Sequence, residues 1–334
     1  MESKHGAEGR RDGAVELRVW RQFLAVAEEL HFGRAAQRLH MTQPPLTQAV
    51  AQLEKALGAR LFDRSRRRVA LTPAGQALVP GVQDLLARAA ALPGRARAAA
   101  AGELGRLRLA FVSTAGYEQL PAWVRAFRAA CPRVALELVE ATGDVQLEAL
   151  ARGEVDAGLM LHAPGAAPSG LRSLRVSTEP MVLALPASHP LAASDRPGWA
   201  AVRDEPLVIF PRRIAPSLHD AVLGMYRTAG RSPAVAQEAI QMQTIVNLVS
   251  AGIGLAWVPE SVTRFRREGV VYRTPRGARA GRGGAPAVPV CETSLVWPPE
   301  PAPPALERFI ASVREHLAAD PAGGPSAPGA PAAA

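Results

Sequence analysis

The sequence lacks the features typical of secreted and membrane proteins. Its two cysteines, Cys131 and Cys291, lie far apart and have no second ligand type at metal spacing, so neither a disulfide framework nor a zinc site is expected. Two buried thiols are the favoured interpretation. No apolar run approaches the roughly 20 residues of a membrane span, and the N-terminal residues contain no apolar segment typical of a signal peptide. A cytoplasmic protein without a membrane partner is therefore expected.

Signatures of an enzyme are also missing. The seven histidines show no metal-ligand spacing, and no serine lies in a G-x-S-x-G motif. Gly252 and Gly254 form a short G-x-G but lack the rest of a dinucleotide-binding fingerprint. A tight turn from helix to strand is the simpler explanation for these glycines. No enzyme activity, metal or cofactor is expected.

Basic residues are concentrated near the N-terminus. The net charge of the chain is +9, and between Val15 and Gly75 ten Arg and Lys residues stand against five Asp and Glu. An acidic polymer is the expected partner of this segment. Residues 1–14 are polar, and residues 319–334 are rich in Ala, Pro and Gly. Both ends are expected to be disordered.

The basic segment has the pattern of three short helices. Apolar residues recur at spacings of three and four in residues 17–27, 35–39 and 46–57. Thr42 is a suitable N-cap for the third helix, and Pro44 and Pro45 then fall in its first turn, where proline removes no intrahelical bond. The outward face would carry polar side chains able to bond base edges, Gln43, Thr47 and Gln48. An ordinary helical hairpin with a solvated polar face is the alternative.

A basic hairpin follows and favours the DNA-binding interpretation. Residues 61–72 contain two strand-like pieces around a tip with four arginines, Arg64, Arg66, Arg67 and Arg68, as in a wing that follows phosphates. Through FLAVAEELHFGRAAQRLHMTQPPLTQAVAQLEKALGARLFDR and LTPAGQAL, residues 17–77 closely resemble the N-terminal domain of LysR-type transcriptional regulators. A winged helix-turn-helix over residues 15–74 is therefore expected. It would bind double-stranded DNA through Arg34, Thr42, Gln43, Pro44, Thr47, Gln48, Arg64, Arg66 and Arg67.

A longer helix is expected over residues 75–102. Its apolar positions step by four, three, four and three, as in a coiled-coil seam, at Leu78, Val82, Leu85, Ala89 and Leu92. The alternative is a helix packed onto its own domain, and the family resemblance favours pairing of two chains. Pro80 is expected to kink the helix, Pro93 to bend or end it, and residues 96–105 to form a hinge.

The rest of the chain alternates between strand and helix patterns. The segments at residues 107–112, 120–130, 134–140, 147–150 and 155–161 alternate strand and helix, which is typical of a parallel, doubly wound sheet. A second set follows between residues 181 and 258. This part resembles the LysR-type effector domain in residues 107–160, in LALPASHPLA and in AIQMQTIVNLVSAGIGLAWVPESV. The resemblance implies two α/β lobes over residues 106–318, like those of periplasmic binding proteins, closing over a small effector.

The same resemblance sets the bounds of the lobes. The first would cover about residues 106–161 and 269–318, and the second about residues 162–268. Strands near residues 270–272 and 294–297 and a helix over residues 305–317 would complete the first lobe. The segment Gly277–Pro289 is longer and looser than the family pattern, so a mobile insertion is expected there.

Hydroxyl side chains follow two strands of the expected first lobe. Ser113 and Thr114 come after the first strand and Thr142 after the second. In such sheets ligands bind beyond the carboxyl ends of the strands, near helix N-termini, although each residue can equally be a simple N-cap. Resemblance to family members that sense aromatic catabolites implies that these positions hold a carboxylate, with Phe210 and Pro211 facing them. A small organic anion is the expected effector.

These features predict an α/β protein with an N-terminal winged helix-turn-helix, a linker helix and a two-lobe effector domain. By resemblance it is a ligand-responsive LysR-type regulator, a homotetramer that contacts RNA polymerase and controls a catabolic or small-metabolite operon. Two other classes of protein stay open. The first is a two-lobe solute-binding protein or enzyme, which would not need the basic winged unit. The second is a nucleoid-type protein, which would show no effector response.

Overall fold

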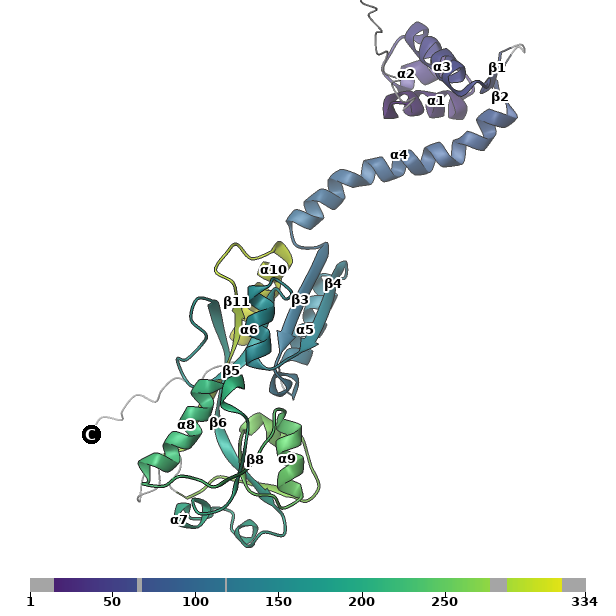
Figure 1. Cartoon of the computed structure of the whole chain (residues 1–334). Helices are drawn as coiled ribbons and strands as arrows, with labels where there is room; N and C mark the ends of the chain where they lie inside the picture. The colour runs from purple at the N-terminus through teal and green to yellow at the C-terminus, as the bar shows by residue number, and fades with distance from the viewer. Residues whose placement is uncertain (1–14, 65–67, 118, 277–286, 320–334) are drawn as a thin grey trace, which may run out of the picture. The chain divides into compact units, whose positions relative to one another are not determined.

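The computed structural model describes residues 15–64, 68–117, 119–276 and 287–319 (Figure 1). The expectations for both chain ends, for most of the segment 277–289 and for Arg66 and Arg67 lie outside the described residues. The chain forms two compact units, Met1–Arg97 and Ala98–Ala334.

The described part of the first unit begins with three short helices and a two-stranded hairpin. Their bounds are α1 Leu17–Glu29, α2 Phe32–Arg38, α3 Gln43–Leu57, β1 Phe62–Asp63 and β2 Ala70–Leu71. This confirms the order that the apolar spacing predicts. The Phe62 ring lies 5.6 Å from that of Phe23 and 5.8 Å from that of Phe32. Burial of these three rings anchors the hairpin to the first two helices.

One long helix, α4 (Pro73–Ala100), follows the hairpin. Thr72 caps it, because Thr72 Oγ1 accepts a hydrogen bond from the Gly75 N–H (3.1 Å). Pro80 and Pro93 lie inside α4. Of the two expectations for Pro93, that it ends the helix is wrong, and residues 96–100 of the expected hinge are helical. The alanine-rich segments on either side of Pro93 favour helix enough to continue it past that proline. None of the helices in the described ranges is both long and apolar enough to cross a membrane.

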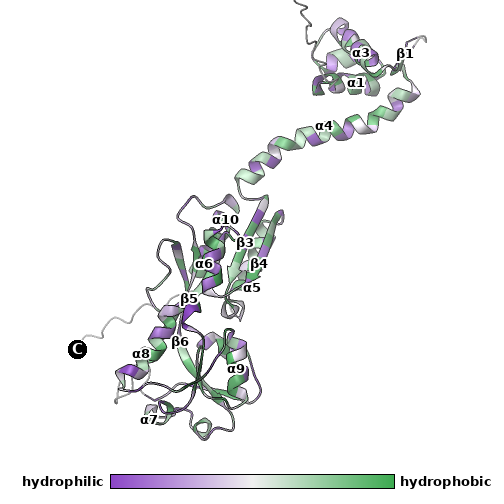
Figure 2. Cartoon of the chain, viewed as in Figure 1, coloured by the Kyte–Doolittle hydropathy of each residue, from purple (hydrophilic) through white to green (hydrophobic). Residues whose placement is uncertain are grey.

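The apolar stripe of α4 divides into two parts. Near its start, Val82 is 4% exposed, and Leu78 and Leu86 pack against the same core of the first unit. Further along, Leu85 and Leu92 are 40% and 58% exposed, and Figure 2 shows hydrophobic and hydrophilic residues alternating along the helix. The first part of the stripe therefore packs on its own domain, and only the second part is left for another chain.

The first lobe of the second unit is built on a mixed sheet. Its elements are β3 Gly105–Phe111, η1 Ser113–Tyr117, α5 Leu120–Ala130, β4 Val134–Glu140, α6 Gly143–Ala151, β5 Ala157–His162, β11 Val290–Trp297 and α10 Pro304–Ala319. Strands β4, β3 and β5 are parallel neighbours, as predicted, whereas β11 runs antiparallel to β5. Helices α5 and α10 pack together, with the rings of Phe127 and Phe309 5.4 Å apart.

A long strand, β6 (Arg172–Pro186), passes from the first lobe into the second. Residues 172–180 pair with β11, and residues 181–186 pair with β9 and β10. The other second-lobe elements are η2 Pro190–Ala193, α7 Trp199–Val202, β7 Leu207–Ile209, η3 Arg212–Ile214, α8 Pro216–Thr228, β8 Val235–Glu238, α9 Met242–Ser250, β9 Ala256–Pro259, η4 Glu260–Arg264 and β10 Val270–Arg273. The second lobe has its own apolar core.

Two expectations about the lobes are wrong. The strand at residues 270–272 does not complete the first lobe, because β10 pairs with residues 183–186 of β6 and packs against the second-lobe core. Residues 172–180 do not belong to the second lobe, because they pair with β11. Short apolar runs in a sequence do not show that one strand serves two sheets.

Candidate functional site

The start of α3 carries most of the residues expected at DNA. Thr42 has the extended backbone of an N-cap (φ −80°, ψ 155°), although its hydroxyl makes no capping bond, and Pro44 lies in the first turn. The prolines therefore mark the start of the helix. Gln43 and Gln48 are exposed, and Thr47 Oγ1 donates a hydrogen bond to the Gln43 carbonyl (3.0 Å). This end of α3 thus offers side-chain amides to solvent, as contact with base edges requires.

Hydrogen bonds fix the start of α2. His31 Nδ1 accepts from the backbone N–H groups of Gly33 (3.0 Å) and Arg34 (3.2 Å), so His31 is a local cap. The Arg34 guanidinium donates to Glu29 Oε2 (3.2 Å), yet the Arg34 side chain stays 61% exposed. Arg34 is thus oriented by Glu29 and still accessible to a phosphate. A groove lined by Arg34, Gln43 and residues 68–69 brings α2, α3 and the hairpin together.

Glu54 of α3 holds the hairpin in place. Its Oε1 accepts from the backbone N–H groups of Leu61 (2.8 Å) and Phe62 (3.1 Å), and its Oε2 accepts from Arg64 (3.2 Å). The Arg64 guanidinium also lies 4.9 Å from the centroid of the Phe32 ring, a distance suited to a cation–π contact. Arg64 is therefore engaged in the fold of the hairpin as well as being near its basic tip.

A cleft between the two lobes brings together four of the five residues expected at the effector. Ser113, Thr114 and Thr142 line it from the first lobe, and Phe210 lines it from the second. Pro211 is not among the described residues of its wall and instead precedes η3. The space in the cleft, including its open mouth, is about 450 Å³.

Ser113 and Thr114 begin η1 directly beyond β3. They are 9% and 5% exposed, and Thr114 Oγ1 has no hydrogen-bond partner among the residues that the structure describes. Leaving a buried hydroxyl unpaired costs about 1 to 3 kcal/mol. A polar group of a ligand in the cleft would remove that cost.

Thr142 occupies the N-cap position of α6 through its backbone (φ −71°, ψ 161°), but its hydroxyl makes no bond to the helix N–H groups. The hydroxyl donates instead to the Asp144 carboxylate, which lies 3.5 Å from the guanidinium of Arg213 in the second lobe. A Cβ on Gly143 would lie 2.6 Å from the carbonyl oxygen of Ile214. Glycine therefore allows α6 and η3 to meet at one edge of the cleft.

Other parts of the cleft wall are not evident from the sequence. Ala215 precedes α8, Gln241 precedes α9, and both line the cleft. Together with α6, three helices thus begin at it, each with first-turn N–H groups that lack helical partners. Much of the remaining wall is apolar, including Leu161, Ile214, Ile240 and Met242. Only the topology of the two sheets brings these helix starts together.

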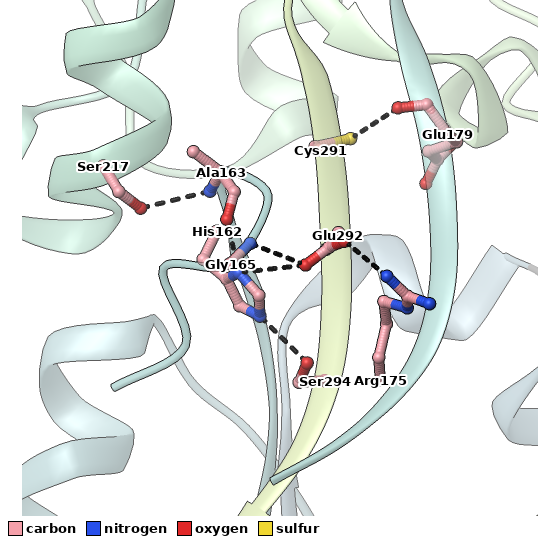
Figure 3. A network of polar contacts seen from close by, with 9 residues as sticks. All are labelled: His162, Ala163, Gly165, Arg175, Glu179, Ser217, Cys291, Glu292 and Ser294. Carbon is pink, nitrogen blue, oxygen red and sulfur yellow. Dashed lines mark hydrogen bonds and ion pairs between the residues drawn. The ribbon is translucent and has the colours of Figure 1, made fainter. Parts of the chain in front are cut away.

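A buried polar network lies at the junction of the lobes (Figure 3). Glu292 accepts a hydrogen bond from Arg175 (3.1 Å), and His162 Nε2 lies 2.9 Å from Ser294 Oγ. The backbone N–H of the residue after His162 donates to Ser217 Oγ at the start of α8 (3.1 Å). His162, Glu292 and Ser294 are all buried, and none of them lines the cleft. The network therefore orders the junction and does not form part of the ligand site.

Comparisons with known proteins agree with this division of the chain. Residues 17–76 match the family model for the bacterial regulatory helix-turn-helix protein, lysR family, and residues 100–318 match that for the LysR substrate binding domain. The chain belongs to the LysR family of transcriptional regulators.

The similarity to known proteins extends over nearly their full length. The HTH-type transcriptional regulator IlvR of Caulobacter vibrioides is 44% identical over 302 residues, which cover 90% of this chain and 98% of IlvR. The crystal structure of CbnR complexed with its target DNA is 32% identical, with a TM-score of 0.74 over 90% of this chain and 99% of that chain. The oxidized form of OxyR from Corynebacterium glutamicum is 26% identical, with a TM-score of 0.59, covering 95% of this chain and 98% of that chain.

Proposed function

We propose that this regulator binds double-stranded DNA through its winged unit and senses a small organic carboxylate in the cleft between its lobes. The observation that carries the ligand assignment is the unpartnered, buried hydroxyl of Thr114 at a cleft where α6, α8 and α9 begin. Helix N-termini attract anions through their free N–H groups and the helix dipole. No basic side chain among the described residues lines the cleft, so hydroxyls and helix ends would bind the carboxylate.

An aromatic acid suits the rest of the cleft. Phe210 is 1% exposed, and Ile214 and Met242 lie beside it in the wall. These side chains would cover the apolar body of a ligand. The resemblance to family members that sense aromatic catabolites supports the same class. The regulated genes would then form a catabolic or small-metabolite operon.

Regulation would work through the assembly of several chains. The exposed edge of α4 would pair two chains, and two such dimers would form a homotetramer. Effector binding would change the arrangement of the subunits, and with it DNA bending and contact with RNA polymerase. The effector must bind one arrangement more tightly, because equal affinity shifts no equilibrium. Such a regulator would act in the cytoplasm and would not be an enzyme.

A mobility-shift assay with promoter fragments and unrelated DNA tests the DNA-binding part. We expect a preference for a promoter fragment that responds to an added effector. Gln43→Ala should reduce discrimination at one base pair by roughly 1 to 3 kcal/mol if Gln43 contacts a base. Equal binding to all fragments would indicate a nucleoid-type protein, and no binding would favour a two-lobe solute-binding protein.

A thermal-shift panel of small carboxylates tests the effector part. The panel contains benzoate, butanoate and their hydroxylated derivatives, with the corresponding uncharged amides as controls. A ligand that binds only the folded protein raises its stability by about 2.7 kcal/mol at one hundred times its Kd. We expect a rise in melting temperature with an acid and none with its amide. A panel without any shift would overturn the carboxylate assignment.

A further inference from the structure

We infer that Gln241 recognises a hydroxyl group of the effector, so that the preferred ligand is a hydroxy acid; this inference rests on the proposed carboxylate site. Gln241 is half-buried and lines the cleft from the second lobe. The other second-lobe residues of the wall are apolar, namely Phe210, Ile214, Ala215, Ile240 and Met242. Within the described ranges, Gln241 is therefore the only polar side chain that this lobe contributes to the cleft.

Within the described part of the chain, the amide of Gln241 makes no internal hydrogen bond. Gln241 is the N-cap of α9 (φ −95°, ψ 140°), yet its side chain makes no capping bond, and it makes no hydrogen bond to another described residue. Serine, threonine, aspartate or asparagine would serve the helix better at this position. Helix capping therefore does not explain a glutamine here, and its two donors and its carbonyl oxygen are free for a ligand.

The two sides of the cleft differ in a way that orients a ligand. The first lobe offers the hydroxyls of Ser113 and Thr114, donors suited to a carboxylate, whereas the Thr142 hydroxyl in the same wall donates to Asp144. Across the cleft, the Gln241 amide is uncharged and both donates and accepts. A hydroxyl is the smallest group that can satisfy an amide in both roles. A ligand with its carboxylate at the first lobe and a hydroxyl at its other end would therefore contact both lobes.

The test uses the full-length protein and acids that differ by one hydroxyl: benzoate with 3- and 4-hydroxybenzoate, and butanoate with 4-hydroxybutanoate. By calorimetry we expect at least one hydroxy acid to bind about tenfold more tightly than its parent, which is the ratio that one net hydrogen bond supplies. Gln241→Met keeps the side-chain length but removes the amide. It should abolish this preference, so that the parent acid and its hydroxylated form bind this variant with equal affinity.

Two further variants separate binding from folding. Gln237→Met is the matched control, because Gln237 is exposed on β8 and its amide donates to the Glu238 carbonyl (2.9 Å); the preference should persist there. Gln241→Ser supplies a favourable N-cap for α9 but cannot reach the ligand, so it should lose the preference without loss of stability.

The outcomes distinguish this inference from the proposed function. If parent and hydroxylated acids bind equally well, the carboxylate site stands and the role of Gln241 is wrong. The same conclusion follows if Gln241→Met weakens both acids alike, because the residue would then only shape the wall. If no acid in the panel binds, the carboxylate site and the role of Gln241 fail together.

Discussion

Thr114 is a residue at which stability and ligand binding should oppose each other. Its Oγ1 is buried without a partner, and Thr114→Val replaces the hydroxyl with a methyl group of similar size. We expect the free energy of unfolding of the ligand-free protein to rise by about 1 kcal/mol and the affinity for a bound acid to fall about tenfold. Urea unfolding and calorimetry measure the two effects. A less stable variant with unchanged affinity would show that the hydroxyl serves only the fold.

The two cysteines should be unreactive in the folded protein. Cys131 is 2% exposed and Cys291 is 0% exposed, as the sequence predicts. Burial raises the pKa of the Cys291 thiol well above its usual value, so little of the reactive thiolate forms at neutral pH. We expect no labelling by Ellman's reagent at neutral pH until guanidinium unfolds the chain. Rapid labelling of the native protein would instead favour redox sensing.

At the scale of structural elements, Arg64 and Arg68 of the β1–β2 hairpin are expected to have different roles. Arg64 bonds Glu54 and covers the Phe32 ring, whereas Arg68 is exposed. Arg64→Ala should lower the free energy of unfolding by about 1 kcal/mol. Arg68→Ala should leave stability unchanged but reduce the slope of log affinity against log salt by about one, as expected for one lost phosphate contact. Thermal melts and DNA titrations at several salt concentrations measure both, and an unchanged slope would remove Arg68 from the DNA contacts.

Local patterns are enough to predict most of the individual elements. The helix Leu120–Ala130 and the strand Val134–Glu140 have the bounds that their apolar spacing predicts, because both are set by short-range periodicity. The 15-residue strand β6 could not be predicted in this way. It changes partners near Met181, and strand pairing depends on residues that are distant in sequence. The bounds of α4 are close to the expected residues 75–102. Whether Pro93 ends this helix could not be predicted, because proline is a strong but not absolute helix breaker.

Only some of the residues that line the effector cleft could be predicted from the sequence. Ser113, Thr114 and Thr142 could be proposed because a hydroxyl after a strand end is visible in the sequence. Gln241 could not, because the start of α9 has no local feature that distinguishes it from other helix starts. The contact between Asp144 and Arg213 was also hidden, since it joins two lobes whose relation is set by the whole fold.

For the effector domain as a whole, some of the contacts between the lobes are weak in energy. Asp144 and Arg213 lie 3.5 Å apart with side chains 28% and 61% exposed, and such surface pairs contribute about 0 to 1 kcal/mol. The backbone N–H of Ala163 adds one hydrogen bond to Ser217 (3.1 Å). A ligand that contacts both lobes needs only about 1.4 kcal/mol of differential binding to change a conformational ratio tenfold. Binding in the cleft can therefore alter the relation of the lobes.

Pairing of two chains should depend on the exposed edge of α4. Leu85 and Leu92 are 40% and 58% exposed and recur at the heptad spacing of a coiled-coil seam. Leu85→Asp or Leu92→Asp would place one carboxylate from each chain against apolar surface, and desolvation costs several kcal/mol per ion. In analytical ultracentrifugation we expect these variants to dissociate, and in DNA titrations to lose affinity for an operator with two half-sites.

Ile253→Asp is the matched control for this experiment. Ile253 is 42% exposed in the second unit, so its substitution adds the same charge to a similarly exposed apolar position away from α4. The control should sediment like the wild type and bind the operator normally. The loss of pairing and of operator affinity in the α4 variants would then be due to the position of the added charge and not to the charge itself. If Leu85→Asp and Leu92→Asp also sediment like the wild type, α4 does not pair the chains, and the spacing of two DNA-binding units must be set by the effector domains.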